Sequence, residues 1–187
     1  MTLDELKHDC IQCKKCPLYE SRTNLVFGTG CENADILFIG EAPGKDEDLQ
    51  GVPFVGRSGK LLDKYFEAVG INRESIYIAN ILKCRPPNNR DPKPEEEECC
   101  IDWLREQTRL INPKMIVCLG RIAAMKIISP TFRITAQHGQ FTERKGVVLC
   151  AVYHPSLLLR DPRKKDDMME DMLNIVAKAK ELGLRYD

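Results

Sequence analysis

The sequence has no apolar run that approaches the roughly 20 residues needed to cross a bilayer. Its N-terminal segment, residues 1–7, is charged and lacks the apolar centre of a signal peptide. Net charge is also absent, because 28 basic and 28 acidic side chains cancel. These absences argue against a membrane or secreted protein and against one that coats nucleic acid through its overall charge. We therefore expect a cytoplasmic protein with no membrane partner.

Internal repeats, low-complexity regions and a linker long enough to separate two domains are also missing. The 187 residues, 43% of them hydrophobic and 30% charged, have the composition of a soluble globular protein. That length is enough for one domain with a real core. We expect residues 1–187 to form this single domain and to be monomeric.

Cysteine, in contrast, is plentiful, with nine residues. An odd number argues against a fully paired secreted framework, and cytosolic disulfides are usually unstable. Cys13 and Cys16 form a Cys-x2-Cys pair, and Cys84 and Cys100 could complete a four-cysteine site. The second half lacks a Cys-x2-Cys knuckle, so zinc-ribbon spacing is not met. The spacing leaves both zinc and an iron–sulfur cluster open.

The remaining five cysteines differ in their sequence surroundings. Cys10 and Cys99 lie near the four in sequence and compete with them as ligands. Cys118 and Cys150 lie within apolar runs, which is typical of inert core residues. Cys31 lies in a polar turn and has no assigned role.

Apolar runs alternate with helical patterns along the chain. The expected strands cover 35–40, 75–80, 114–120 and 147–152, and the expected helices cover 2–7, 58–69, 95–111, 123–128 and 166–182, with a tight loop over 10–16. This alternation predicts an α/β sandwich around a largely parallel sheet. Such sheets bind ligands at the carboxyl ends of their strands. Three informative segments fall at these strand ends: Glu41–Gly44, Asn80 and His154–Ser156.

Each candidate residue has a functional and an ordinary interpretation. Glu41 could orient or deprotonate water, or cap an ordinary tight turn. Asn80 offers a donor and an acceptor side by side, or simply forms a turn. His154, followed by a proline, could donate a hydrogen bond to developing negative charge, or be a satisfied surface histidine. Phe54 could stack on a planar base or belong to the core.

Read together, these motifs resemble the family 4 uracil-DNA glycosylases, the iron–sulfur members of that superfamily. The matching segments, in order, are Cys13–Cys16, Arg22–Thr23, Val26–Gly30, Gly40–Gly44, Glu47–Asp48, Gly51–Gly59, Asn80–Pro87, Asn89–Arg90, Cys100, Leu119–Gly120 and His154–Arg160. They span about residues 10–180 in one register, and the ordered set is far more specific than any single motif. One departure is Ser156, where the family often has alanine.

The resemblance implies a three-layer sandwich with a central four-stranded, mainly parallel sheet flanked by helices. It implies a DNA-repair enzyme that flips and excises uracil from single- or double-stranded DNA and leaves an abasic site. This reaction begins base-excision repair of deaminated cytosine. The resemblance also implies a [4Fe-4S] cluster held by Cys13, Cys16, Cys84 and Cys100, through an N-terminal iron–sulfur loop.

The resemblance also implies a role for each residue of the site. Asn80 would read N3–H and O4 of uracil, a donor–acceptor pair that cytosine presents in reverse. His154 would stabilise charge on uracil O2, and Glu41 would position the attacking water, because Ala42 occupies the slot of the catalytic aspartate in the cluster-free family. The implied uracil-binding residues are Glu41, Ala42, Glu47, Phe54, Asn80 and His154, with Glu47 crowding the 5-position against thymine's methyl. The implied DNA contacts are Arg57, Ser58, Arg85, Arg90 and Arg160.

Two other classes compete with this interpretation. A non-catalytic metal-binding nucleic-acid module would use the cysteines and basic segments, but gives no reason for Glu41, Asn80 and His154 at strand ends. A thiol oxidoreductase would use Cys13 and Cys16 as a redox pair. That motif normally begins a helix after a strand, whereas here it precedes the first strong strand.

Overall fold

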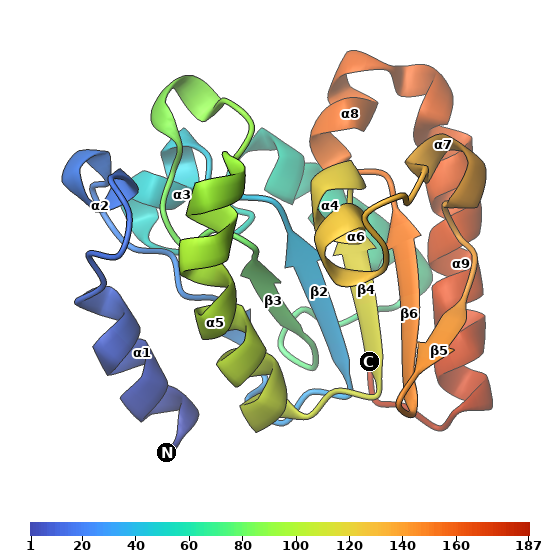
Figure 1. Ribbon diagram of the computed structural model, residues 1–187. Coiled ribbons are helices and arrows are strands. Elements are labelled where there is room, and N and C mark those ends of the chain that lie inside the picture. Colours follow the sequence, from blue (N-terminus) through green and yellow to red (C-terminus); the bar gives the residue numbers. More distant parts are fainter.

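The computed structural model describes residues 1–187 and places a six-stranded sheet between layers of helices (Figure 1). The parallel strands at its centre are β2 (Ile36–Gly40), β3 (Tyr77–Asn80), β4 (Met115–Leu119) and β6 (Val147–Val152), adjacent in the order β3-β2-β4-β6. They are the four predicted strands, and the α/β sandwich is confirmed. The sheet has six strands rather than four, because β1 (Thr29–Gly30) and β5 (Thr142–Arg144) add short antiparallel edges. Segments of two and three residues are too short to produce a recognisable alternation.

Nine α-helices surround this sheet. They are α1 (Leu3–Ile11), α2 (Leu18–Ser21), α3 (Lys45–Gln50), α4 (Arg57–Val69), α5 (Pro94–Ile111), α6 (Arg121–Ile127), α7 (Ile134–Gln137), α8 (Pro155–Arg160) and α9 (Lys165–Glu181), with short 3-10 turns η1 (Pro87–Asn89) and η2 (Pro162–Lys164). The five predicted helices correspond to α1, α4, α5, α6 and α9. Helix α1 is longer than expected, so Cys10 lies in its last turn rather than in a loop. No helix is both long and apolar enough to span a bilayer.

Helix α1 begins where its sequence predicts. The Thr2 hydroxyl accepts from the Glu5 amide at 3.2 Å, and the Glu5 carboxylate accepts from the Thr2 amide at 2.7 Å. This capping box satisfies two amide donors at the helix N-terminus. Helix α4 ends as predicted at Gly70, which takes a left-handed conformation with a φ of 79°.

Alternate strand residues pack into two cores on opposite faces of the sheet. Ile36 and Phe38 of β2 pack into the core that contains α4 and α9 residues, whereas Leu37 and Ile39 pack with α1, α5 and α6. Figure 1 shows α5 and α6 in front of the sheet and α4 behind it. A parallel sheet covered on both faces is buried throughout, which explains why every residue of β2 is buried.

The chain switches faces between the two middle strands. The helix α4, between β2 and β3, packs on one face, and α6, which follows β4, packs on the other. Ligands of open α/β sheets bind outside the carboxyl ends of the strands at such a switch point. Gly40 and Asn80 are register partners at this edge, and His154 lies two residues beyond the end of β6.

Candidate active site

A cavity of about 370 Å³ opens over this edge of the sheet. The turn after β2, the start of α4, the end of β3 and the start of α8 all contribute to its wall. Among the residues that line it are Glu41, Ala42, Glu47, Phe54, Asn80 and His154. The structure therefore brings all six expected uracil-binding residues together around one cavity.

Asn80 presents the most unusual atom in this cavity. The residue is only 3% exposed. Its Oδ1 is the only buried side-chain nitrogen or oxygen atom in the structure with no hydrogen-bond partner. A buried acceptor without a partner costs about 1–3 kcal/mol, so such atoms are rare and commonly functional. The site therefore has an unmet need for a donor at this position.

Gly40 makes room for the Asn80 side chain and the Phe54 ring. A Cβ atom at position 40 would lie 2.5 Å from Asn80 Oδ1 and 2.7 Å from Phe54 Cζ. Those separations are shorter than real Cβ contacts allow, so only glycine fits under both groups.

Phe54 forms an aromatic wall of the cavity. Its ring centroid is 5.6 Å from that of His154, with 33° between the ring planes. The residue is 5% exposed and belongs to the core on the α4 side. Its φ is +52°, a left-handed conformation that costs a residue with a bulky side chain roughly 1–3 kcal/mol.

His154 is held as a neutral donor. Its Nδ1 accepts from the Ser156 amide at 3.1 Å and lies 2.7 Å from the Ser156 hydroxyl oxygen. An Nδ1 that accepts from an amide carries no proton, so the ring proton is on Nε2. Burial, with a smaller effect from Arg160, lowers the pKa of His154 to about 4. Ser156, the departure from the family pattern, adds a hydroxyl group to the support of this ring.

Glu41 has an environment that favours its protonated form. Burial is the main cause that raises the pKa of Glu41 to about 7, and Asp91 raises it further. The cations of Arg121 and Arg160 oppose this shift. A carboxyl group that titrates near neutral pH suits proton transfer.

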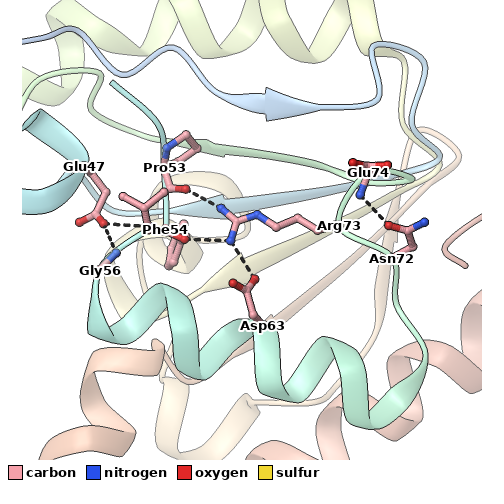
Figure 2. Close-up of polar contacts among 9 residues, drawn as sticks. Glu47, Pro53, Phe54, Gly56, Asp63, Asn72, Arg73 and Glu74 are labelled. Carbon is pink, nitrogen blue, oxygen red and sulfur yellow. Dashed lines mark hydrogen bonds and ion pairs between the residues drawn. The ribbon is translucent and has the colours of Figure 1, made fainter. Parts of the chain in front are cut away.

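Glu47 is buried and its carboxylate is fully engaged by the protein backbone. Oε1 accepts from the Gly44 amide at 3.1 Å, and Oε2 accepts from Val55 at 3.0 Å and Gly56 at 2.7 Å. Figure 2 shows this carboxylate beside Gly56. Glu47 thus ties the turn after β2 to the loop that carries Phe54, a bracing contact that the sequence did not predict.

The five expected DNA contacts fall into two groups. Arg57, Ser58 and Arg90 line the cavity, whereas Arg85 and Arg160 do not. Arg90 already forms a bidentate ion pair with Glu96, at 2.6 and 3.0 Å. Such a pairing leaves less of its charge available to a phosphate.

Two of these arginines lie outside the cavity wall. The Nε of Arg85 donates to Asn89 Oδ1 at 2.8 Å. Arg160 is the exposed last residue of α8, next to the lining residue Leu159, and its charge lowers the pKa values of both Glu41 and His154.

Leu159 is a lining residue that the sequence did not single out. It is 37% exposed, although large and apolar, and it lies on α8 beside the cavity. The run Leu157–Leu159 gives no sign of which leucine is exposed, because helix α8 was not predicted. The buried member of the run is Leu158.

Four cysteines from distant parts of the chain meet beside this cavity. Cys13, Cys16, Cys84 and Cys100 line one small pocket with the apolar side chains of Leu18, Leu25, Leu82 and Trp103. Cys99 lines it as well, so pocket lining alone does not separate the ligand candidates.

Hydrogen bonds to sulfur distinguish three of the four expected ligands from Cys99. Arg22 Nη1 donates to Cys84, Trp103 Nε1 to Cys13 and the Lys83 amide to Cys100, each at 3.3 Å. Cys16 receives no such bond; burial raises its pKa, and the nearby Leu18 amide opposes that shift. Three of the four expected ligands therefore receive an N–H donor. Neither Cys10 nor Cys99 receives one.

This arrangement fits thiolate ligands of an iron–sulfur cluster, whose sulfurs commonly accept N–H hydrogen bonds. No group of three or more His, Cys, Asp or Glu side chains could hold a metal ion as the residues stand. A [4Fe-4S] cluster differs from a single ion, because each of four cysteines binds a separate iron. Cys118 and Cys150 are buried in β4 and β6, as expected of core residues.

Lys83 connects the cysteine pocket with the cavity. It is fully buried, and its Nζ donates to the backbone oxygens of Phe27 (3.0 Å) and Asn80 (3.2 Å) and to Gln107 Oε1 (2.5 Å). Its own amide donates to the sulfur of Cys100. One residue therefore contacts both the segment that presents Asn80 and an expected cluster ligand.

The fold and this cavity are those of an α/β enzyme with a ligand site at the strand ends, and comparison with known proteins identifies its family. The sequence pattern of the Uracil DNA glycosylase superfamily matches residues 27–177, and the chain belongs to that superfamily. Within it, the chain is similar to a type-4 uracil-DNA glycosylase of Archaeoglobus fulgidus, with 45% identity over 93% of this chain and 92% of that protein. A type-4 uracil-DNA glycosylase of Thermotoga maritima is 42% identical over 90% and 88% of the two chains. The chain is a member of the type-4 uracil-DNA glycosylase family.

Proposed function

We propose that this protein excises uracil from DNA by hydrolysing the N-glycosidic bond and leaves an abasic site, the first step of base-excision repair. The observation that carries the proposal is the unpaired Oδ1 of Asn80 beside Phe54 and the neutral His154. Uracil supplies the missing donor through N3–H, and O4 accepts from the Asn80 amide nitrogen. Cytosine, with an acceptor at N3, would leave Oδ1 unpaired.

The reaction requires a flipped nucleotide, because the glycosidic bond is inaccessible within the base stack. Phe54 stacks on the flipped base, and Leu159 and Arg160 at the cavity mouth fill or border the gap in the duplex. As the bond between C1′ and N1 breaks, its electron pair moves to uracil. The Nε2–H of His154 donates to O2 of the resulting anion, an interaction worth roughly 3–4 kcal/mol.

Water completes the reaction at the sugar. The Glu41 carboxylate orients the water that attacks C1′ and accepts its proton. Ala42 lines the pocket, and Arg57, Ser58, Arg85 and Arg90 provide polar groups for phosphates. The Glu47 carboxylate accepts hydrogen bonds from three amides. We therefore propose that Glu47 shapes the pocket near the uracil 5-position indirectly, by holding the loop that carries Phe54.

We propose that Cys13, Cys16, Cys84 and Cys100 hold a [4Fe-4S] cluster. When bound, the cluster would cross-link the N-terminal segment to the segment that follows Asn80, and the reaction draws no chemistry from it. The N–H donors to three of the four sulfurs and the nearby cations of Arg22 and Lys83 support a negatively charged group in this pocket. We further propose that residues 1–187 act as one monomeric domain, on single- and double-stranded DNA, in the cytoplasm.

The non-catalytic and redox alternatives account for fewer of these features. A binding module needs no cavity with an unpaired base-reading atom and a fixed neutral histidine. A redox pair at Cys13 and Cys16 would begin a helix after a strand, yet these residues lie between α1 and α2, before the first strand.

The direct test is a glycosylase assay with the purified, cluster-bearing protein. Single- and double-stranded oligonucleotides that contain one uracil should yield abasic sites, and matched thymine and cytosine oligonucleotides should not. An intact uracil oligonucleotide after prolonged incubation would refute the proposed function.

The rate of excision should rise with pH through about 7. The pKa of Glu41 is about 7, so its carboxylate, the form that accepts a proton, predominates only above that pH. His154, with a pKa of about 4, stays neutral from pH 5 to 9 and adds no change in this range. Replacing Glu41 with glutamine should flatten the profile and lower the plateau roughly a hundredfold. Single-turnover rates from pH 5 to 9 measure both effects.

Glu97→Gln is a matched control for this profile. Glu97 is one of the carboxylates that raise the pKa of Glu41, and it does not line the cavity. This variant should keep the rise with pH and move it to lower pH. If the excision rate of Glu41→Gln still rose with pH as in the wild type, a group other than Glu41 would control the pH dependence.

A further inference from the structure

The loop that carries Phe54 is held in a conformation that its sequence disfavours. Phe54 has a φ of +52°, which bulky side chains rarely adopt. Helix α4 packs closely behind it, since a Cβ atom on Gly59 would lie 2.1 Å from the carbonyl carbon of Phe54. Something outside the loop must therefore stabilise this backbone.

Arg73 contacts the strained backbone directly. It lies in the turn between α4 and β3, and it donates through Nη2 to the Pro53 oxygen at 2.5 Å and through Nη1 to the Phe54 oxygen at 2.8 Å. Figure 2 shows the guanidinium group between these two oxygens and the carboxylate of Asp63. The distance from Nη1 to Asp63 Oδ1 is 2.8 Å. A planar fork can bind two neighbouring carbonyls at once, which a lysine ammonium group does less well.

Glu47 holds the same loop from the other side. Its Oε2 accepts from the amides of Val55 and Gly56, the two residues after Phe54. A cation therefore binds the carbonyls at 53 and 54 while an anion binds the amides at 55 and 56. The Phe54 carbonyl and the Val55 amide belong to one peptide plane, and these contacts hold both ends of it. The plane in turn orients the backbone from which the Phe54 ring projects.

We propose that Arg73 is a positioning residue for base binding, which holds the left-handed backbone of Phe54 so that its ring lies flat against the flipped base. The inference rests on the proposed function for the role of the ring, but not for the bracing itself. Arg73 does not line the cavity, so a base bound there would not contact it. Its effect on the reaction must therefore pass through Phe54.

A double-mutant cycle tests this coupling, with Arg73→Met, Phe54→Ala and the double variant. Arg73→Met should weaken the binding of free uracil and lower kcat/KM on a uracil oligonucleotide, each about tenfold. In the Phe54→Ala background the same change should cost less than about twofold, because the ring it positions is gone. Additive losses in the double variant would overturn the proposal.

Two further variants separate positioning from general stability. Asp63→Asn removes the partner of Arg73 and leaves both carbonyl contacts, so uracil binding should change less than about twofold. Arg73→Lys should fall between the wild type and Arg73→Met. Arg109→Met is the control on the surface, since Arg109 is exposed and pairs only with Glu106. Equal losses in Asp63→Asn and Arg73→Met would place the effect in the ion pair and refute the bracing role.

Hydrogen exchange gives a readout that needs no activity. The amides of Val55 and Gly56 should exchange about tenfold faster in Arg73→Met than in the wild type or in Arg109→Met. Unchanged protection would refute the brace, whatever the enzyme does. If Arg73→Met does not fold, Arg73→Lys and Asp63→Asn decide the question by the same measurements. A wild type with no glycosylase activity would refute the proposed function and leave the exchange result to judge the brace.

Discussion

Replacing Asn80 with aspartate should lower kcat/KM for uracil excision by roughly a thousandfold or more. The carboxylate keeps an acceptor for N3–H but has no donor for uracil O4. It also places a negative charge beside a base that becomes an anion in the transition state. A site built to pair polar groups rejects a mismatched partner by such large factors because buried groups are then left unsatisfied. Steady-state kinetics on a single-stranded uracil oligonucleotide measures this change.

The control for this variant is Asn33→Asp, the same chemical change in an exposed turn that precedes β2, at the opposite end of that strand from the cavity. It should leave the kinetics within about twofold of the wild type. A thermal melt should show that Asn80→Asp is still folded. Wild-type excision by Asn80→Asp would mean that the base edge is read by another group.

Replacing Cys100 with serine should remove most of the iron and the broad visible absorption of the protein. Cys100 is buried in α5, and its sulfur accepts a hydrogen bond from the Lys83 amide, as a proposed cluster ligand should. Because the cluster would cross-link the loop between α1 and α2, the 80–84 segment and α5, its loss should cost on the order of 4 kcal/mol of folding free energy. For a chain of this size, that corresponds to a fall in Tm of about 10 °C. Iron analysis, an absorption spectrum and calorimetry measure these effects.

Cys99→Ser is the neighbouring control. Cys99 lines the same pocket but receives no N–H donor, so its variant should keep the iron and the colour. Loss of colour in Cys99→Ser with retention in Cys100→Ser would reverse the ligand assignment. A colourless wild type that binds zinc would refute the cluster itself.

The central strands were predictable because each is buried on both faces. The segment that forms β2 is an unbroken apolar run that ends at Gly40, and the cavity residue Glu41 follows it directly. The start of α1 at Thr2 and the end of α4 at Gly70 were also predictable, because each depends on one or two residues that are close in sequence. The edge strands β1 and β5 and the short helices α2, α3, α7 and α8 carry too few residues for a periodic signal.

The site was only partly predictable, for a different reason. Motif order identified the residues that line the cavity, but not how they are held. The engaged carboxylate of Glu47 depends on amides eight and nine residues away, and the role of Arg73 depends on carbonyls 19 and 20 residues away. The tautomer of His154 depends on the Ser156 amide and hydroxyl, which face the ring only after α8 forms, and its neutral state depends mainly on burial. Contacts of this kind arise from packing and leave no local pattern in a single sequence.

The fully buried Lys83 also sets a length constraint on the chain. Residues 80–84 run from Asn80 to the expected cluster ligand Cys84, and Lys83 bonds both to the backbone oxygen of Asn80 and to the sulfur of Cys100, a second expected ligand. A one-residue insertion or deletion between Asn80 and Cys84 would misplace either the Asn80 side-chain amide or the Cys84 sulfur, because the bonds of Lys83 leave this segment no room to adjust. The exposed segment of residues 87–89 lies beyond Cys84 and carries no such double attachment. Variation in loop length among relatives should therefore be tolerated after Cys84 and excluded before it, so that the spacing of these two residues acts as a molecular ruler.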